Sequence, residues 1–231
     1  GMGGHDAGDV ASSLVRDAWR TLFDALLEQE GQRESKLVDG LVHATMNANR
    51  AISDYVDNLD RAAMMGSTLL GVLLLDRRLF WVSIGDSPLY LHRNGRLIRV
   101  NEDHSMAPII DAQAADGTIS VEQARQHPDR NQLTSVVAGG PIPRIDCPSL
   151  PLELAQGDII LVASDGLQSL EDIEIQSLLN THQAAPAQDI SMILLQALQA
   201  VGNRDQDNIS IAVIKPLNIR KQAMSEVKQV Q

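Results

Sequence analysis

Apolar residues recur at helical spacing near the start of the chain. From Ala11 to Leu27 they fall every three or four positions, and Gly31 follows as a stop signal. A second stripe of the same period runs from Leu37 to Tyr55, with polar residues between its members. The pattern therefore predicts two consecutive amphipathic helices, each with one apolar face to bury.

The period changes at Ser67, where short apolar or alternating runs separated by turn residues begin. These runs predict strands over residues 69–75, 79–84, 89–92 and 96–100. Asn94-Gly95 is typical of a two-residue type I′ hairpin, which needs positive φ at both positions. We expect these strands to form a meander.

The second half of the chain mixes polar stretches with further elements. Residues 104–143 indicate an inserted flap with one helix, whose start at Ser120-Val-Glu-Gln123 has the spacing of a capping box. Beyond the flap, the pattern predicts elements in the order strand, helix, helix and strand, over residues 159–163, 173–179, 190–201 and 209–214, before a polar tail at 218–231. Hairpin-linked strands with helices grouped in pairs indicate an α+β fold with antiparallel sheet, in one domain over 1–217.

Composition and charge narrow the classes of partner. The chain has 231 residues, of which 44% are hydrophobic, enough for one domain with a well-buried core. Its formal net charge of -11 argues against a nucleic-acid partner, because that affinity comes from clustered Lys and Arg. Cys147 is the single cysteine, and neither a signal peptide nor a membrane-length apolar stretch is evident, so we expect a reducing cytoplasm and no membrane partner. Cys147 has no identifiable partner for a nucleophilic role.

Two aspartates stand at the ends of predicted buried strands. Asp165 follows the strand 159–163, and Asp207 precedes the strand 209–214. If these strands pair antiparallel, both carboxylates emerge at one edge of one sheet, where they repel each other unless a cation intervenes. Magnesium and manganese prefer such oxygen ligands. The alternatives are that Asp165 caps a short helix near Leu167 and that Asp207 lies in an ordinary surface turn.

The glycine-rich start, Gly1 to Gly8, has the composition of a phosphate-binding loop before a helix. Two departures oppose that reading. Asp9 stands where a P-loop needs lysine, and Asp6 occupies the third glycine position of the dinucleotide fingerprint. A tight turn into the helix and a metal-site loop remain as alternatives.

Three further polar residues carry weaker signals. Asp86 follows a predicted strand, and we interpret it as structural support. His5 and His104 are interpreted as surface or capping histidines rather than catalytic ones.

Seven short motifs follow one another from the first residue to about Ile214. They are Gly1-Met-Gly-Gly-His-Asp-Ala-Gly-Asp-Val-Ala-Ser12, Met65-Gly-Ser-Thr68, Ile84-Gly-Asp-Ser87, Glu102-Asp-His-Ser105, His127-Pro-Asp-Arg-Asn-Gln-Leu-Thr134, Ser164-Asp-Gly166 and Asp207-Asn208. In these motifs and their order, the chain resembles the metal-dependent protein phosphatases, the type 2C serine/threonine phosphatases, in their bacterial form. The resemblance implies an antiparallel β-sandwich flanked by helix pairs, in four layers ordered α-β-β-α.

The resemblance also implies an activity, the hydrolysis of phosphoserine and phosphothreonine on proteins by a metal-bound water. Two Mg²⁺ or Mn²⁺ ions serve this chemistry in the family, and many bacterial members hold a third. Asp165 and Asp207 correspond to the metal carboxylates, Gly1 to the glycine whose backbone carbonyl ligates, and Asp103 to the third-metal aspartate. His5 is the candidate for the histidine that protonates the leaving alkoxide in some members.

The match departs from the family at its start. In the family, the aspartate that bridges the metals directly precedes the Gly-Met-Gly-Gly motif, and an upstream segment supplies two strands, another acidic ligand and a phosphate-gripping arginine. Because the sequence begins at Gly1, we expect weak metal binding, impaired hydrolysis and exposed sheet edges suited to a homodimer. The alternative is a non-catalytic module of the same fold that binds a phosphoprotein or another partner.

The implied partners are a phosphorylated protein substrate and a cognate serine/threonine kinase system. Residues 106–124 correspond to the flap that contacts substrate in the family.

Overall fold

A computed structural model describes residues 1–2, 5–27, 34–59, 64–202 and 208–216. The chain divides into two compact units. Unit 1 comprises Gly1–Leu73, Phe80–Ser87 and Asn101–Pro151, and unit 2 comprises Leu74–Leu79, Pro88–Val100 and Leu152–Gln231. Among the described residues, no helix combines the length and the apolar content that crossing a bilayer requires.

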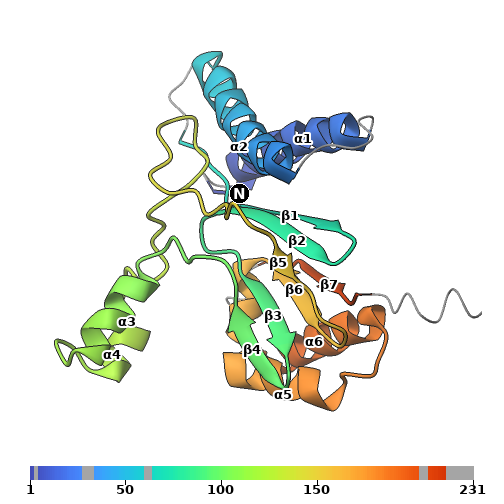
Figure 1. Cartoon of the computed structure of the whole chain (residues 1–231). Coiled ribbons are helices and arrows are strands. Elements are labelled where there is room, and N and C mark those ends of the chain that lie inside the picture. Colours follow the sequence, from blue (N-terminus) through green and yellow to red (C-terminus); the bar gives the residue numbers. More distant parts are fainter. Residues whose placement is uncertain (3–4, 28–33, 60–63, 203–207, 217–231) are drawn as a thin grey trace, which may run out of the picture. The chain divides into compact units, whose positions relative to one another are not determined.

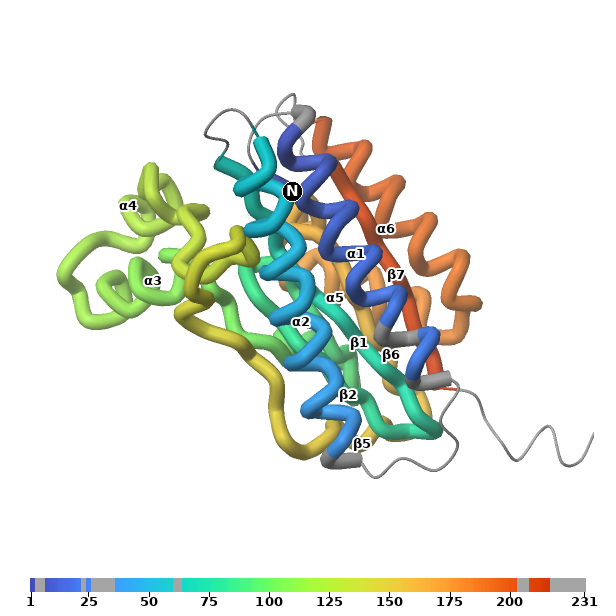
Figure 2. The backbone as a smooth tube through the Cα atoms, turned by 90° about the horizontal axis from the view of Figure 1, so that it is seen from above, coloured from blue at the N-terminus to red at the C-terminus, as the bar shows by residue number. Residues whose placement is uncertain are grey.

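Two long helices pack side by side in unit 1, α1 (His5–Leu27) and α2 (Glu34–Asp57), as Figures 1 and 2 show. The predicted apolar stripes are their buried faces, and these carry Ala11, Val15 and Trp19 on α1 and Leu37, Leu41, Ala44, Ala48 and Ile52 on α2. Tyr55, which the periodicity assigns to the second stripe, is 38% exposed. The buried part of that stripe therefore ends at Ile52.

A three-stranded sheet contains β1 (Leu69–Leu75), β2 (Arg78–Ile84) and the short β5 (Leu152–Glu153), in the order β1-β2-β5. The sequence pattern missed β5, which is too short to show a period. β1 and β2 are joined by a tight turn in which Asp76 has a φ of 55°.

The sheet of unit 2 has the order β4-β3-β6-β7, with every neighbouring pair antiparallel. Its strands are β3 (Leu89–Arg93), β4 (Arg96–Arg99), β6 (Ile159–Ala163) and β7 (Ile211–Ile214). The type I′ hairpin is confirmed, since Asn94 and Gly95 have φ of 53° and 78°. The predicted meander is wrong, because β2 and β3 belong to different sheets. On the side away from β4, β3 pairs with β6, which comes about 70 residues later in the chain.

Helices α5 (Asp172–Thr181) and α6 (Ala187–Val201) cover one face of this sheet (Figure 1). With the short 3₁₀ helix η1 (Asp165–Ser169) they bury a core that includes Tyr90, Leu161, Leu167, Ile175, Leu179, Ile190 and Leu194. Removing this apolar surface from water is the main stabilisation of the unit. The helices and antiparallel sheets confirm the predicted α+β class.

The flap segment of unit 1 holds two helices, α3 (Ala107–Ala115) and α4 (Val121–Arg125), where one was predicted. The capping box at the start of α4 is confirmed, with Ser120 and Gln123 bonded reciprocally. The start of α3 was not predicted: Pro108 lies in its first turn, but no side chain caps it and the turn has no acidic residue.

Candidate metal centre

Asp165 lies at the end of the central strand β6 of the unit 2 sheet. The chain leaves β6 through Ser164, whose backbone is extended, and enters η1. Gly166 and Leu167 are buried, whereas Asp165 is exposed. Leu167 thus anchors the turn in the core while Asp165 faces solvent. Asp165 does not cap a helix, because the N-cap position of η1 belongs to Ser164 and no side-chain capping bond forms there.

The antiparallel pairing of β6 with β7 continues past the strand ends. The backbone N–H of Ser164 donates to Ser210 O at 3.0 Å, and the Ser210 N–H donates to Ser164 Oγ at 3.0 Å. The Ser164 hydroxyl in turn donates to Asn208 O at 3.1 Å. This antiparallel pairing is the condition under which both strand ends meet at one edge of the sheet, and it brings Asn208 beside the residue that precedes Asp165. Asp207 itself lies outside the described residues.

The first residues of unit 1 are fixed by backbone contacts. Met2 N–H donates to Gly66 O at 2.7 Å, and Gly66 N–H donates to Met2 O at 3.1 Å. Gly1 lies so close to α1 that a Cβ on Gly8 would sit 2.7 Å from Gly1 O. The carbonyl of Gly1, the predicted backbone ligand, is therefore held against the first turns of α1. His5 is the first residue of α1, and its side chain lies outside the described part of the structure.

The expected loop from Gly1 to Gly8 is shorter than predicted, because α1 already begins at His5. Gly8 lies within the helix, where the close approach of Gly1 leaves no room for a side chain. A long phosphate-binding loop is therefore excluded, whereas Gly3 and Gly4, on which the choice between a tight turn and a metal-site loop depends, lie outside the described residues.

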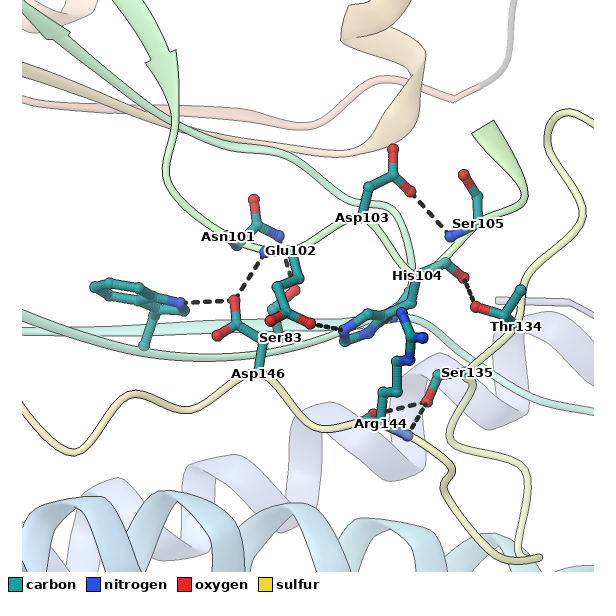
Figure 3. A network of polar contacts seen from close by, with 12 residues as sticks. Ser83, Asn101, Glu102, Asp103, His104, Ser105, Thr134, Ser135, Arg144 and Asp146 are labelled. Carbon is teal, nitrogen blue, oxygen red and sulfur yellow. Dashed lines mark hydrogen bonds and ion pairs between the residues drawn. The ribbon is translucent and has the colours of Figure 1, made fainter. Parts of the chain in front are cut away.

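Asp103 lies in the segment 101–105 of unit 1, whose polar contacts Figure 3 shows. Asp103 is half-buried, and one carboxylate oxygen accepts the Ser105 N–H at 3.0 Å. Asn101, at the start of the segment, is buried and donates to Ser83 Oγ at 2.8 Å. The segment is therefore tied to the end of β2 before it reaches the predicted third-metal ligand.

Asp146 also fixes the segment 101–105, although no motif in the sequence pointed to it. Its Oδ2 accepts hydrogen bonds from Trp81 Nε1 at 3.0 Å and from the Glu102 N–H at 2.9 Å. Its backbone exchanges two hydrogen bonds with Ser83, at 2.8 and 3.0 Å.

Burial, together with the charge of Asp146, raises the pKa of the Cys147 thiol to about 11. That thiol is protonated at neutral pH, which supports the prediction that it has no nucleophilic role.

The interpretation of His104 as a surface or capping histidine is wrong. Its side chain is fully buried, and Nδ1 accepts the Gly85 N–H at 3.3 Å. A single histidine in a loop has no periodicity that could reveal its burial. The only available signal was its place in the Glu102-Asp-His-Ser105 motif.

Within the flap, Arg130 links the two helices. Its guanidinium donates to both carboxylate oxygens of Asp111, at 2.6 and 2.9 Å, and to Ala124 O at 3.4 Å. The hydrogen bonds to Asp111 raise the pKa of Arg130. This contact holds α3 and α4 together, while the predicted contact of residues 106–124 with substrate stays a prediction.

Comparison with known proteins identifies the family. A family model described as protein phosphatase 2C matches residues 1–206. This chain belongs to the protein phosphatase 2C family. The match runs through both compact units and includes the motifs around Gly1, Asp103 and Asp165.

Relatives of this phosphatase 2C chain include bacterial serine/threonine phosphatases. The serine/threonine protein phosphatase PstP of Mycobacterium tuberculosis is 33% identical over 215 residues, which are 92% of this chain and 38% of PstP. The chain thus spans about two fifths of the length of that relative. The serine/threonine phosphatase stp of Listeria monocytogenes is 27% identical over 220 residues, which are 93% of this chain and 81% of stp.

Solved structures show the same fold. The S. agalactiae serine/threonine phosphatase has a TM-score of 0.77 at 26% identity, covering 93% of this chain and 84% of its own. The catalytic domain of PstP, solved in complex with two manganese ions, has a TM-score of 0.70 at 29% identity, covering 92% of this chain and 83% of its own.

The predicted ligands of this phosphatase 2C chain fit such ions in their donor chemistry. The exposed residue Asp165 carries the hard oxygen donors that Mg²⁺ and Mn²⁺ prefer, and Asn208, which follows Asp207 in the sequence, lies at the same strand end. Gly1, His5 and Asp103 belong to unit 1, whereas Asp165 and Asp207 belong to unit 2. The described residues contain no group of three or more His, Cys, Asp or Glu side chains placed to hold a metal. The ligand assignment therefore stays a prediction.

Proposed function

We propose that this chain catalyses metal-dependent hydrolysis of phosphoserine and phosphothreonine on proteins. Membership of the protein phosphatase 2C family supports the reaction, and the PstP structure with two manganese ions supports the metal class. The single observation that carries the proposal within this chain is the pairing of β6 with β7, which places Asn208 beside the neighbour of Asp165.

The assigned residues have separate roles in the proposed reaction. Asp165 and Asp207 supply carboxylates for two Mg²⁺ or Mn²⁺ ions. The Gly1 carbonyl supplies a backbone oxygen, and Asp103 serves a third, weaker ion. When bound, such ions supply Lewis acidity toward the phosphoryl oxygens and make water nucleophilic near neutral pH.

The chain itself contributes rigidity to this site. Asp165 follows a strand whose register is fixed on both sides, by β3 and by β7, so the backbone leading to its carboxylate is held in place without a metal. The Gly1 carbonyl is fixed by the hydrogen bonds of Met2 with Gly66. We assign His5, at the start of α1, to proton donation to the leaving serine or threonine oxygen.

The expected partners follow from this reaction. The substrates are phosphoproteins, and a cognate serine/threonine kinase supplies them. Cys147 is a free thiol, which supports a reducing, cytoplasmic location. A homodimer through sheet edges is supported by β1, an edge strand made only of apolar residues and glycine.

The test is hydrolysis of p-nitrophenyl phosphate and of a phosphothreonine peptide, measured against Mn²⁺ concentration. We expect Asp165→Asn to abolish Mn²⁺-stimulated hydrolysis and to weaken Mn²⁺ binding. Asp189→Asn is the matched control, because it removes one negative charge from an exposed position of the same unit. It should leave both quantities unchanged.

Two outcomes would count against the proposal. Equal Mn²⁺-stimulated rates in Asp165→Asn and Asp189→Asn would remove Asp165 from the metal site. A wild-type chain that binds phosphopeptide without turnover at any Mn²⁺ concentration would instead support the non-catalytic binding module.

A further inference from the structure

The buried side chain of His104 forms a clamp between two loops of unit 1. Its Nδ1 accepts the Gly85 N–H at 3.3 Å, and its own backbone N–H donates to Gly85 O at 3.1 Å. The two residues are therefore joined by a reciprocal pair of hydrogen bonds. This pair fixes the segment 101–105 to the turn that follows β2.

A second set of contacts holds His104 from the side of the flap. Its carbonyl oxygen accepts both the backbone N–H of Thr134, at 2.7 Å, and the Thr134 hydroxyl, at 2.9 Å. Ser105, the next residue, forms a β-bridge with Leu133. His104 is thus bonded on both sides, and Asp103 lies directly before it (Figure 3).

The Gly85 N–H requires a side-chain acceptor from position 104. Because Nδ1 accepts a backbone N–H, the neutral ring carries its proton on Nε2. Nε2 lies 3.4 Å from Oε2 of Glu102, whose side chain is 66% exposed, whereas the ring is fully buried. An apolar side chain of similar size would fill the space but would leave the Gly85 N–H without its acceptor.

The turn that receives the clamp is itself constrained. Gly85 has a φ of 100°, and a Cβ there would lie 2.5 Å from Thr68 Cγ2. Ser87 meets the Thr68 hydroxyl at 3.2 Å and accepts, through its carbonyl, a hydrogen bond from Asn101 at 2.9 Å. The turn to which His104 is bonded is therefore held by contacts of its own.

We propose that His104 is a positioning residue for Asp103, setting the direction of its carboxylate through the reciprocal bonds with Gly85. This inference rests on the proposed function in so far as Asp103 is a metal ligand. Losing a group that bonds a metal ligand directly changes metal affinity by about 10- to 100-fold. His104 acts on Asp103 through the backbone of residues 103–105, where the Ser105 N–H bonds the Asp103 carboxylate at 3.0 Å, so we expect an effect at the lower end of that range. The effect falls on the ion held by Asp103, and catalysis at saturating metal changes far less.

The experiment compares four proteins: the wild-type chain, His104→Leu, His104→Asn and His92→Leu. Leucine fills the ring volume without an acceptor, whereas the Oδ1 of asparagine replaces Nδ1 as acceptor. His92→Leu is the matched control, because His92 is also fully buried but lies in β3 of unit 2, where its Nε2 pairs with Asn180. Mn²⁺ binding is followed by the paramagnetic resonance signal of free Mn²⁺, alongside hydrolysis of p-nitrophenyl phosphate.

We expect His104→Leu to weaken the weakest Mn²⁺ site by about 10-fold or more. His104→Asn should stay close to wild type, and His92→Leu should not change Mn²⁺ affinity. Equal Mn²⁺ affinity in His104→Leu and wild type would overturn the proposal. So would an equal loss of affinity in His92→Leu, because that result would point to general destabilisation.

Amide hydrogen exchange of the metal-free proteins separates this inference from the proposed function. The Gly85 and Ser105 amides should exchange faster in His104→Leu than in wild type, and His104→Asn should restore their protection. If wild type neither binds Mn²⁺ nor hydrolyses phosphate esters, the proposed function fails, and unchanged exchange in His104→Leu would then overturn the clamp as well.

If His104→Leu does not fold, Thr134→Val tests the same segment, since it removes only one donor to His104 O. It should shift Mn²⁺ affinity in the same direction, and an unshifted affinity would contradict the proposal.

Discussion

The packing of α1 on β1 depends on one glycine and can be tested by a single methyl group. Gly71 lies under the indole of Trp19, and a Cβ at this position would sit 2.3, 2.5 and 2.7 Å from three atoms of that ring. Optimal carbon–carbon contacts are about 3.5–4.0 Å, so the ring or the strand must move by about 1 Å. Overpacking of this kind costs about 1–3 kcal/mol, partly offset by the lower unfolded-state entropy of alanine.

We therefore expect Gly71→Ala to lower the free energy of unfolding by about 1–2 kcal/mol. In a protein of this size that corresponds to a Tm lower by about 2–8 °C. Urea denaturation followed by tryptophan fluorescence measures the change. Gly140→Ala is the control, because Gly140 is exposed and a methyl group added there would have no atom within 4 Å.

A double-mutant cycle identifies the cause. Trp19→Phe removes the outer ring that carries the three close atoms, so Gly71→Ala should cost about 1 kcal/mol less in that background. If Gly71→Ala is no less stable than Gly140→Ala, or if its cost is the same in the Trp19→Phe background as in the wild-type chain, the packing argument is refuted.

Two further predictions concern buried polar groups. Burial alone would raise the pKa of Asp158, but hydrogen bonds from Arg93, at 2.9 and 2.6 Å, and from the Ala155 N–H lower it below its usual value. This carboxylate therefore stabilises the fold above the unfolded pKa of about 3.9, and the stabilisation is lost as pH falls through the lower folded pKa. Asp158→Asn should lower the free energy of unfolding by about 2 kcal/mol at pH 7 and by progressively less in unfolding curves at acid pH. A cost that does not change with pH would contradict the assignment. The Asn49 side chain on α2 donates to Gly140 O at 2.7 Å and accepts the N–H groups of Gly139, at 2.8 Å, and Ala138, at 3.2 Å. Asn49→Ala should therefore lower the free energy of unfolding, measured by urea denaturation, by about 2 kcal/mol, whereas Asn47→Ala, at an exposed position, should lower it little. Equal costs would show that the loop contacts contribute nothing.

Local signals in the sequence were strong enough to predict most elements. The strands β1 and β6 were predicted with the bounds that the structure has, because their apolar runs are continuous and end in turn residues. The hairpin at Asn94-Gly95 and the capping box at Ser120 were predicted from turn and cap chemistry alone. Each of these features depends on residues only a few positions apart.

Pairing between distant strands was beyond the reach of those signals. Four successive strands looked like one meander, yet β3 pairs with β6, whose register is set by packing against α5, α6 and η1. The two-residue strand β5 exists only because β2 offers it a partner. Which strands pair depends on the apolar area that the whole unit buries, and a short stretch of sequence does not reveal that area.

The candidate site shows the same division. The sequence by itself predicted Asp165 and Asp207 at strand ends and put Asp103 in a family motif, because strand ends and motifs are local. The structure places Asp165 just after β6, and Asp207 lies outside the described residues. The tertiary structure alone paired β6 with β7, so that Asn208 lies beside the neighbour of Asp165. It also buried His104 and joined it to Gly85, since burial and hydrogen-bond partners depend on residues that meet only after the chain has folded.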